Sequence, residues 1–347
     1  RSLLSENPLL SLEHSLFYIR FLFFALAVNF YLLKFDKMKY HVGISLWIVT
    51  VFVTFDGLLQ YFTGFNTLNF RADEYRISGI FGEEYVLGSY LSRVMPFCFY
   101  FLAISNNLGK KFFIIAMFFL ILVDVLIFFA GERTAFFYLI LGTAIIVLLT
   151  RKYKLIRAVA FLLSILIILI SVFQLPLLKK RMVNYTLEQI GVSENEEKIK
   201  AFSIEHELHF ISALEMFKDN IIFGHGPKMF RELCKKEKYY PEGCSTHPHN
   251  SYIQLLSETG LIGVSFVLFI FISIVIIFIR QFLGIINISK SFYVDDAKIC
   301  LLAAIFIFLW PLIPTGSFYN NWLNSFVYLV LGFYLFENTK LNNYRDN

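Results

Sequence analysis

Residues 258–279, ETGLIGVSFVLFIFISIVIIFI, decide the fold class of this chain. After Glu258 the stretch runs to Arg280 without a charged side chain, which is long enough for an α-helix to cross the apolar core of a bilayer. A soluble domain offers no environment for an uninterrupted apolar helix of this length. The stretch therefore predicts a transmembrane helix.

The composition of the whole chain supports the same interpretation. Of the 347 residues, 57% are hydrophobic and 16% are charged, where a soluble domain carries roughly 25% charged residues. The chain contains 42 Phe and 19 Tyr, and its mean hydropathy is +0.64. These values exclude a disordered chain and a nucleic-acid-binding module with a basic surface, so no nucleic acid partner is expected. We expect an all-α, polytopic integral membrane helix bundle in contact with membrane lipids.

Eight further apolar segments are long enough to span a membrane. The nine predicted spans are residues 15–33, 42–62, 86–104, 112–130, 134–150, 156–175, 258–279, 298–313 and 318–336. They predict four parts along the chain, namely six membrane helices in 1–175, a loop domain at 176–257, three membrane helices in 258–336 and a tail at 337–347.

Basic residues predict the orientation of the bundle. Lys34 follows the first span, Arg151 and Arg157 follow the fifth, and other lysines and arginines follow the third, seventh and ninth. Because basic connections stay in the cytoplasm, we expect the alternate connections, including the large loop 176–257, on the exterior face and the tail in the cytoplasm. The amino end would also lie outside, and the chain begins with Arg1 rather than Met. We therefore expect an amino-terminally truncated chain that lacks an odd number of upstream spans.

The segment from Lys179 to Asn250 is polar and contains five of the seven histidines of the chain. Within it, apolar residues recur at three- and four-residue steps, which predicts an amphipathic helix over 203–221 with its apolar face on the membrane domain or interface. These residues are Leu208, Ile211, Leu214, Phe217 and Ile221. Gly224 ends the predicted helix, and a turn follows it.

Two cysteines, Cys234 and Cys244, flank a short polar stretch on the exterior face, and the other two lie inside predicted spans. A disulfide between Cys234 and Cys244 is expected in an oxidising compartment. The alternative is a zinc site built from both cysteines with His247 and His249, although no paired C-x-x-C spacing favours it. We expect the disulfide and no metal.

The run HPHNSYIQLLSETGLIG, which begins at His247, joins the exterior loop to the seventh span. A histidine at that boundary, such as His249, would be partly desolvated and neutral near pH 7, and could accept a proton from an alcohol. Nearby polar residues could orient the histidine or a substrate, and nearby glycines would let a helix or a ligand approach the backbone closely. These candidates are Asn250, Glu258, Gly260 and Gly263. The alternative is an interfacial turn whose polar residues face water.

Two arginines are predicted on the same exterior face. Arg76 lies just before the third span, and Arg133 lies in a connection between the fourth and fifth spans that is too short to be a solvated loop. Their guanidinium groups could together hold a lipid pyrophosphate through bidentate, charge-assisted hydrogen bonds. Arg71 is a weaker candidate of the same kind. The alternative is snorkelling to lipid headgroups or, for Arg133, pairing with the adjacent Glu132.

The charged residues inside predicted spans include Arg20, Asp56, Arg93 and Asp124. Each would cost roughly 2.5–3.5 kcal/mol if it were central and faced lipid, so we expect these residues to face the bundle interior or to pair. They are too few and too scattered for the carboxylate relay of a proton-coupled transporter.

The histidine run resembles the signature of the bacterial O-antigen ligase family, which belongs with the O-antigen polymerases and related oligosaccharyltransferases. The resemblance rests on His249-Asn250 followed, after nine residues, by Gly260-x-x-Gly263. Members of this family usually have about twelve spans, so nine spans here would leave about three missing from the amino end.

Three other stretches are similar to elements of the same family. Arg76 lies in Arg-x-x-Gly-x-Phe, and Arg133 lies in Glu-Arg-Thr-Ala, which resembles the Ser-Arg-Gly/Thr-Ala element. The stretch 219–227 is similar to the family's Asp-x-Pro-x-x-Gly-x-Gly turn, with Ile221 at the usual position of proline. The resemblance covers roughly residues 70–335.

The resemblance implies transfer of a glycan from undecaprenyl pyrophosphate to a sugar hydroxyl at the periplasmic face of the bacterial inner membrane, without metal, nucleotide or cofactor. His249 would be the general base, and Arg76 and Arg133 would stabilise the departing pyrophosphate. A ligase would use lipid A-core as acceptor, a polymerase would extend lipid-linked repeats, and a related oligosaccharyltransferase would modify a protein. The non-enzyme alternative is a transporter or flippase.

The sequence departs from the family pattern in one late span. Family ligases often carry an acidic residue there, where this chain has Asn320, Asn321 and Asn324. Glu258 is the expected substitute that orients His249, and His247 is close enough to compete for the role of base. We expect His249 to converge with Arg76 and Arg133 around one outward-facing cavity.

Overall fold

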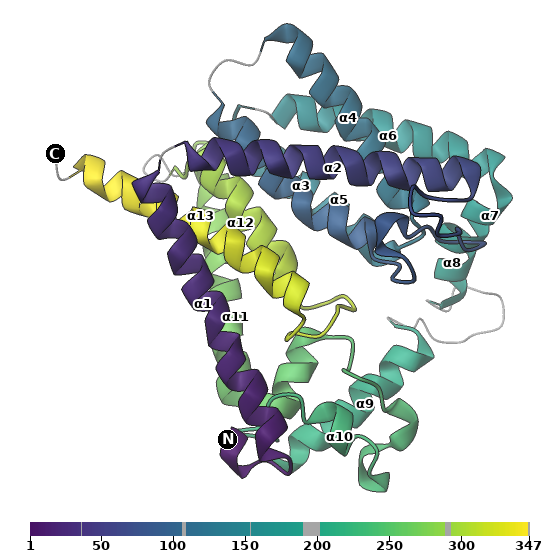
Figure 1. Ribbon diagram of the computed structural model, residues 1–347, viewed down its shortest axis with the longest axis vertical. Helices are drawn as coiled ribbons and strands as arrows, with labels where there is room; N and C mark the ends of the chain where they lie inside the picture. Colours follow the sequence, from purple (N-terminus) through teal and green to yellow (C-terminus); the bar gives the residue numbers. More distant parts are fainter. Residues whose placement is uncertain (36, 106–108, 153, 190–201, 289–292, 346–347) are drawn as a thin grey trace. The chain divides into compact units, whose positions relative to one another are not determined.

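The computed structural model describes residues 1–345, except 36, 106–108, 153, 190–201 and 289–292 (Figure 1). Within these ranges the regular elements are all helices, and one isolated antiparallel bridge joins Phe65 to Arg71. The predicted all-α class is confirmed for the described residues. Part of the predicted loop domain, 190–201, and the end of the predicted tail, 346–347, lie outside them.

Ten helices of the described residues are longer than two turns. They are α1 (Pro8–Lys34), α2 (Met38–Thr63), α3 (Leu87–Ile104), α4 (Lys110–Phe129), α5 (Arg133–Leu149), α6 (Lys154–Gln174), α9 (Ile204–Asp219), α11 (Ser251–Ile285), α12 (Asp296–Phe308) and α13 (Asn321–Arg345) (Figure 1). Short helical segments include α7 (Pro176–Lys179), α8 (Tyr185–Gln189), α10 (Phe230–Leu233) and the 3-10 turn η5 (Pro241–Gly243).

Five helices, α1, α2, α3, α6 and α11, are long and apolar enough to cross a membrane. Two shorter apolar stretches, Ile114–Phe129 and Arg133–Leu149, belong to α4 and α5. The eighth predicted span ends early, because α12 stops at Phe308 and Pro311, which follows closely, disfavours helix at the residues before it. The fold is that of a helical membrane protein with five candidate spans among the described residues. The count of nine and the assignment of membrane sides stay predictions.

The chain packs as two compact units. Unit 1 comprises Arg1–Phe30, Gln189–Ile277 and Phe308–Leu335, and unit 2 comprises Tyr31–Glu188, Phe278–Ile307 and Phe336–Asn347. Unit 1 therefore combines segments from both ends of the sequence with the polar central segment. The predicted division into membrane and loop parts follows the sequence order and stays a prediction.

A buried ion pair joins α4 to α6 in unit 2. The carboxylate of Asp124 and the guanidinium of Arg157 lie 2.7 Å apart, and both side chains are excluded from solvent. Ser164 donates to Asp124 at 3.1 Å, and Arg157 Nε donates to the Thr143 hydroxyl at 3.1 Å. The expected pairing of Asp124 is confirmed. The structure places Arg157 within α6, which begins at Lys154, rather than in the connection before it, and the arginine faces a carboxylate inside the unit.

The other charges inside predicted spans are held by neutral partners. The carboxylate of Asp56 is buried and accepts from the amide of Thr67 at 2.9 Å. Arg20 donates to the side chain of Asn321 at 2.6 Å, and Arg93 donates to a main-chain carbonyl one turn earlier in α3 at 3.0 Å. These residues have structural roles in their own units.

Candidate functional site

Helix α11 is broken at Gly260, whose φ of 64° and ψ of −163° are not helical. The break leaves amides on its carboxyl side and carbonyls on its amino side without helical partners. The turn at 221–226 accepts hydrogen bonds from two of these amides and donates hydrogen bonds to two of these carbonyls. Four main-chain hydrogen bonds make the contact: Leu261 N to Ile221 O (2.9 Å), Ile262 N to Ile222 O (3.3 Å), His225 N to Ser257 O (3.0 Å) and Gly226 N to Glu258 O (2.7 Å).

Glycines make this backbone contact possible. A Cβ atom on Gly260 would lie closer than 3.0 Å to the main chain of the turn, and a Cβ on Gly224 would lie equally close to the main chain of α11. The close approach expected at Gly260 is therefore made by the 221–226 turn of the same unit. Gly263 packs instead against the side chain of Thr259 in its own helix.

Asn250 is the N-cap residue of α11 and directly precedes its first residue, Ser251. Its side-chain oxygen accepts from the amides of Tyr252 (3.0 Å) and Ile253 (3.1 Å), as an N-cap residue does, and its side-chain amide donates to Pro311 O at 2.8 Å. Asn250 thus fixes the main chain directly after His249. Among the residues that the structure describes, no hydrogen bond joins its side chain to that imidazole.

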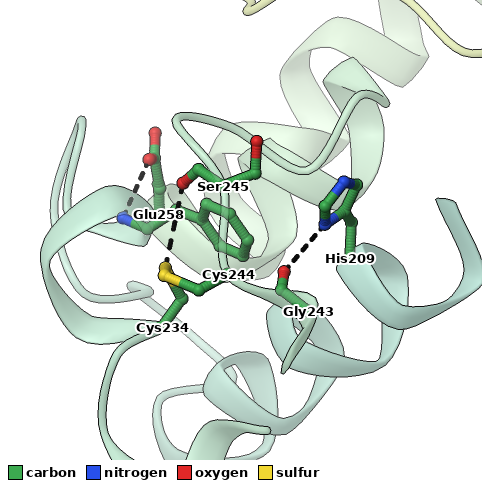
Figure 2. Close-up of a disulfide and its surroundings, with 7 residues drawn as sticks. His209, Cys234, Gly243, Cys244, Ser245 and Glu258 are labelled. Carbon is green, nitrogen blue, oxygen red and sulfur yellow. Dashed lines mark hydrogen bonds between the residues drawn. A yellow bond between two sulfur atoms is a disulfide. The ribbon is translucent and has the colours of Figure 1, made fainter. Parts of the chain in front are cut away.

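Glu258 is buried in unit 1 and holds neighbouring segments together. Its carboxylate accepts from the amide of Phe230 at 3.1 Å (Figure 2) and from the side chain of Gln254 at 3.2 Å. Gln254 in turn accepts from the amide of Phe318 at 2.9 Å. Within the described part of the chain the carboxylate has no hydrogen bond to a histidine, so its expected role in orienting His249 has no support from these contacts.

The asparagines at the start of α13 are structural. Asn320 caps the helix by accepting from an amide of its first turn at 3.0 Å, and Asn324 accepts from the Tyr18 hydroxyl of α1 at 2.8 Å. Asn321 accepts from Arg20. Together they tie α13 to α1 within unit 1.

Four imidazoles of unit 1 lie together, and we call His206, His209, His247 and His249 the histidine cluster. The ring centroid of His249 lies 4.2 Å from that of His247, 5.3 Å from that of His209 and 5.5 Å from that of His206. His206 and His209 are three residues apart on α9, which places both on one face of that helix. The concentration of histidines in the polar segment is a signal for this cluster, but no motif in the sequence predicts a role for His206 or His209.

His249 has a strained backbone and a neutral ring. Its φ of 54° lies in the left-handed region, and its carbonyl accepts from the amide of Thr315 at 2.7 Å. Burial, with smaller contributions from His206 and His209, lowers the pKa of His249 to about 4. The imidazole is therefore neutral near pH 7, which is the form that accepts a proton.

His247 shares these properties. Burial is the main cause that lowers the pKa of His247 to about 3, and the neighbouring His249 adds to the effect. Its buried Nε2 has no hydrogen-bond partner among the described residues. His247 therefore stays a second candidate for the base.

Cys234 and Cys244 form a disulfide in unit 1, with their Cα atoms 5.0 Å apart (Figure 2). Sulfur atoms bonded to each other are not the thiolates that zinc requires. The alternative zinc site with His247 and His249 is therefore wrong for this structure. In the described ranges, no group of three or more His, Cys, Asp or Glu side chains could hold a metal ion.

Three arginines of unit 2 gather around Gly131, and we call Arg76, Arg133 and Arg181 the arginine cluster. Arg181 Nε donates to Gly131 O at 3.1 Å, and Cγ of Arg76 lies 3.2 Å from the position of a Cβ on Gly131. Arg133 follows two residues later and donates to Tyr185 O at 3.4 Å. The structure thus brings the two predicted arginines together and adds Arg181, which was not predicted and lies in the short π-helical segment Lys180–Asn184.

The Arg76 guanidinium is half-buried and incompletely satisfied. It donates to Tyr85 O at 3.0 Å, and its Cζ lies 4.7 Å from the centroid of the Tyr85 ring. Burial is the main cause that lowers the pKa of Arg76, the Glu132 carboxylate opposes it, and the charge of Arg181 adds to it. Its buried Nε has no hydrogen-bond partner in the described part of the chain. An unsatisfied buried donor beside two other guanidinium groups favours an anionic ligand.

Glu132 and Arg71 also lie in unit 2. The Glu132 carboxylate caps α3 by accepting from the amides of Gly88 (2.7 Å) and Ser89 (3.2 Å). Among the described residues it forms no ion pair with Arg133, so that alternative has no support. Arg71 is exposed and is held by a main-chain bridge, without a described contact to the arginine cluster.

His249 belongs to unit 1, whereas Arg76 and Arg133 belong to unit 2. Unit 1 offers a neutral imidazole with no described hydrogen bond to its ring, and unit 2 offers cationic donors suited to phosphate oxygens. The convergence of the three side chains around one cavity stays a prediction.

Comparison with protein families gives an independent assignment. Residues 115–268 match the family model described as O-antigen ligase, and this range contains Arg133, the histidine cluster and Gly260, while Arg76 lies before it. Comparison with curated proteins finds no match to the chain. Over residues 115–268 the match confirms the resemblance of the sequence to the O-antigen ligase and polymerase family.

Proposed function

We propose that this protein is an O-antigen ligase-type glycosyltransferase. It would move a glycan from undecaprenyl pyrophosphate to a sugar hydroxyl of lipid A-core at the periplasmic face of the bacterial inner membrane. The family match supports glycan ligase or polymerase activity in general. The main support for the proposal is the state of His249. Its imidazole is neutral, the ring has no hydrogen bond among the described residues, and the residue directly precedes the candidate membrane span α11.

In the proposed step, the acceptor hydroxyl oxygen attacks the anomeric carbon of the donor sugar. The hydroxyl proton passes to an unprotonated nitrogen of His249 as the bond from the anomeric carbon to the pyrophosphate oxygen breaks. The electron pair of that bond leaves with undecaprenyl pyrophosphate. The activated donor supplies the free energy of transfer, and direct displacement inverts the anomeric centre.

The arginine cluster would act on the leaving group. The diphosphate gains negative charge as the bond breaks, and forked hydrogen bonds from Arg76 and Arg133 stabilise that charge more strongly than the charge of the bound donor. The unsatisfied Nε of Arg76 supports this role.

The first experiment replaces the base. With lipid-linked glycan and lipid A-core as substrates, the purified His249→Ala protein should lose about 10²- to 10⁴-fold in kcat/KM, the usual contribution of a general base. His41→Ala is the matched control, because His41 is exposed and lies outside the histidine cluster. Near-normal turnover of a folded His249→Ala protein would remove this residue as base, and loss in His247→Ala alone would transfer the role to His247.

A genetic experiment identifies the acceptor. In a strain that lacks the protein, gel analysis of lipopolysaccharide should show core without O-antigen. Core that carries a single repeat would instead indicate a polymerase, and normal lipopolysaccharide with an unmodified glycoprotein would indicate protein glycosylation. A transporter would leave the purified protein inactive on lipid-linked glycan.

A further inference from the structure

The orientation of the His249 ring depends on the side chains around it. The Thr315 hydrogen bond and the Asn250 cap fix the main chain on either side of the ring, but neither reaches the imidazole. The ring contacts given by the described residues are with the other three members of the histidine cluster. How these three are held therefore determines how the proposed base is presented.

The three neighbours are anchored differently. His206 Nδ1 lies 2.6 Å from the hydroxyl of Ser203 at the start of the same helix, and His247 Nδ1 lies 3.0 Å from the hydroxyl of the adjacent Thr246. His209 reaches a distant segment, because its Nδ1 lies 2.8 Å from Gly243 O (Figure 2). A carbonyl oxygen can only accept, so Nδ1 of His209 carries a proton and its Nε2 is unprotonated when the ring is neutral.

The Gly243 carbonyl is itself tightly held. The amide of Gly243 donates to Tyr240 O at 2.9 Å within the turn η5, and a Cβ on Gly243 would lie closer than 3.0 Å to Leu208 O of α9. The next residue, Cys244, is bonded to Cys234. Cys234 is fully buried in the core of unit 1, so the disulfide ties this carbonyl to that core.

We propose that the loop 234–244, closed by its disulfide, positions His249 through Gly243 and His209, so that His209 is a positioning residue of the transferase. His209 lies at an interplanar angle of 27° to His249, and the stacked ring fixes one face of the base. The inference rests on the proposed function of His249. Reduction of the disulfide by a dithiol, which transfers two electrons and two protons to the sulfurs, opens the loop and releases the anchor of His209.

The first test is His209→Ala in the full chain. We expect kcat to fall about tenfold with little change in the KM for the donor, because a misplaced base slows the step without weakening donor binding. The acid limb of the kcat/KM profile should also move to higher pH, since His209 contributes to the low pKa of His249. His209→Asn keeps an N–H donor near the position of Nδ1 and should recover most of kcat.

The second test opens the loop. The double variant Cys234→Ala/Cys244→Ala and the wild-type protein treated with a dithiol should both show the fall in kcat seen for His209→Ala. The dithiol should have no further effect on the double variant, which is the matched control for reduction elsewhere. Adding His209→Ala to the double variant should cause no further loss, because all these changes break one chain of contacts.

The inference would be overturned if the His209→Ala protein and the double-cysteine protein both fold and both keep the wild-type kcat and the wild-type acid limb of the kcat/KM profile. Melting temperatures show whether each variant is folded. If His209→Ala does not fold, wild-type kcat in the dithiol-treated protein and in the folded double-cysteine variant would overturn the inference equally. Loss of activity in His249→Ala without loss in the loop variants removes this inference alone, whereas an active His249→Ala protein removes the proposed role of His249 as base.

Discussion

Arg133 has one hydrogen bond among the described residues, to Tyr185 O, which leaves most of its five N–H donors for a ligand. Replacing Arg133 with Lys keeps the charge but removes the planar fork that matches two phosphate oxygens. We expect kcat/KM on lipid-linked glycan to fall by about tenfold or more, the equivalent of one lost charge-assisted hydrogen bond. Arg280→Lys, at an exposed position of α11, is the control. Unchanged kinetics for Arg133→Lys would mean that the residue meets only lipid headgroups.

The histidine cluster predicts an unusual pH dependence. His249 accepts a proton only when it is neutral, and burial lowers the pKa of His249 to about 4. The kcat/KM value should therefore stay high down to about pH 5 and be halved near pH 4, whereas an unperturbed histidine would already be half-protonated near pH 6.5. An acid limb near pH 6.5 in the wild-type protein would contradict the buried, neutral ring.

The same pKa shift affects stability. The unfolded chain binds a proton at His249 near pH 6.5 and the folded chain only near pH 4, so the stability contribution is present above pH 6.5 and is lost as the pH falls toward 4. Melting temperatures measured at each pH separate this unfolding from the titration of the base.

At the scale of elements, the break in α11 depends on Gly260. Alanine there would have to adopt a φ of 64° and would place its Cβ closer than 3.0 Å to the 221–226 turn. We expect Gly260→Ala to lower the free energy of unfolding by about 1–3 kcal/mol and to reduce transfer, because the turn and the start of α11 separate. Thermal unfolding in detergent measures the change. Gly109→Ala is the control, because a Cβ there has no neighbour within 4 Å among the described residues, and equal melting temperatures for the two variants would contradict this account.

The sequence predicted the glycines at the break in α11 but not the contact that they make. Gly260 and Gly224 were identified as positions of close approach and of a turn, since glycine tolerates a positive φ. That these two positions meet was not predictable from either local pattern, because their contact consists of main-chain hydrogen bonds between segments more than 30 residues apart. The amphipathic helix shows the same limit. Its buried residues include Phe210, Ala213 and Met216, whereas the expected face with Ile211 and Leu214 is exposed.

At the scale of the whole molecule, the Asp124 and Arg157 pair is the contact whose loss should matter most for unit 2. Asp124→Ala leaves a buried guanidinium without its counter-charge and should cost about 3–5 kcal/mol of stability. Replacing both residues together, Asp124→Leu with Arg157→Met, should cost much less, because no charge remains buried. Chemical denaturation of the two variants in detergent measures the difference. If the single variant is as stable as the double variant, the pair contributes little.

The amino-acid sequence by itself indicated a helical membrane protein, and it carried the resemblance to the O-antigen ligase and polymerase family that the match of residues 115–268 supports. An apolar run of bilayer length can satisfy its own backbone only as a helix, and the spacing of His249, Asn250, Gly260 and Gly263 is a local signal.

Only the tertiary structure decided which side chains meet. It joined His206 and His209 to His249, placed Arg181 beside Arg76 and Arg133, and turned Arg157 toward Asp124. The physical reason is that these contacts are between single polar side chains of segments distant in sequence, and such contacts leave no periodic pattern along the chain.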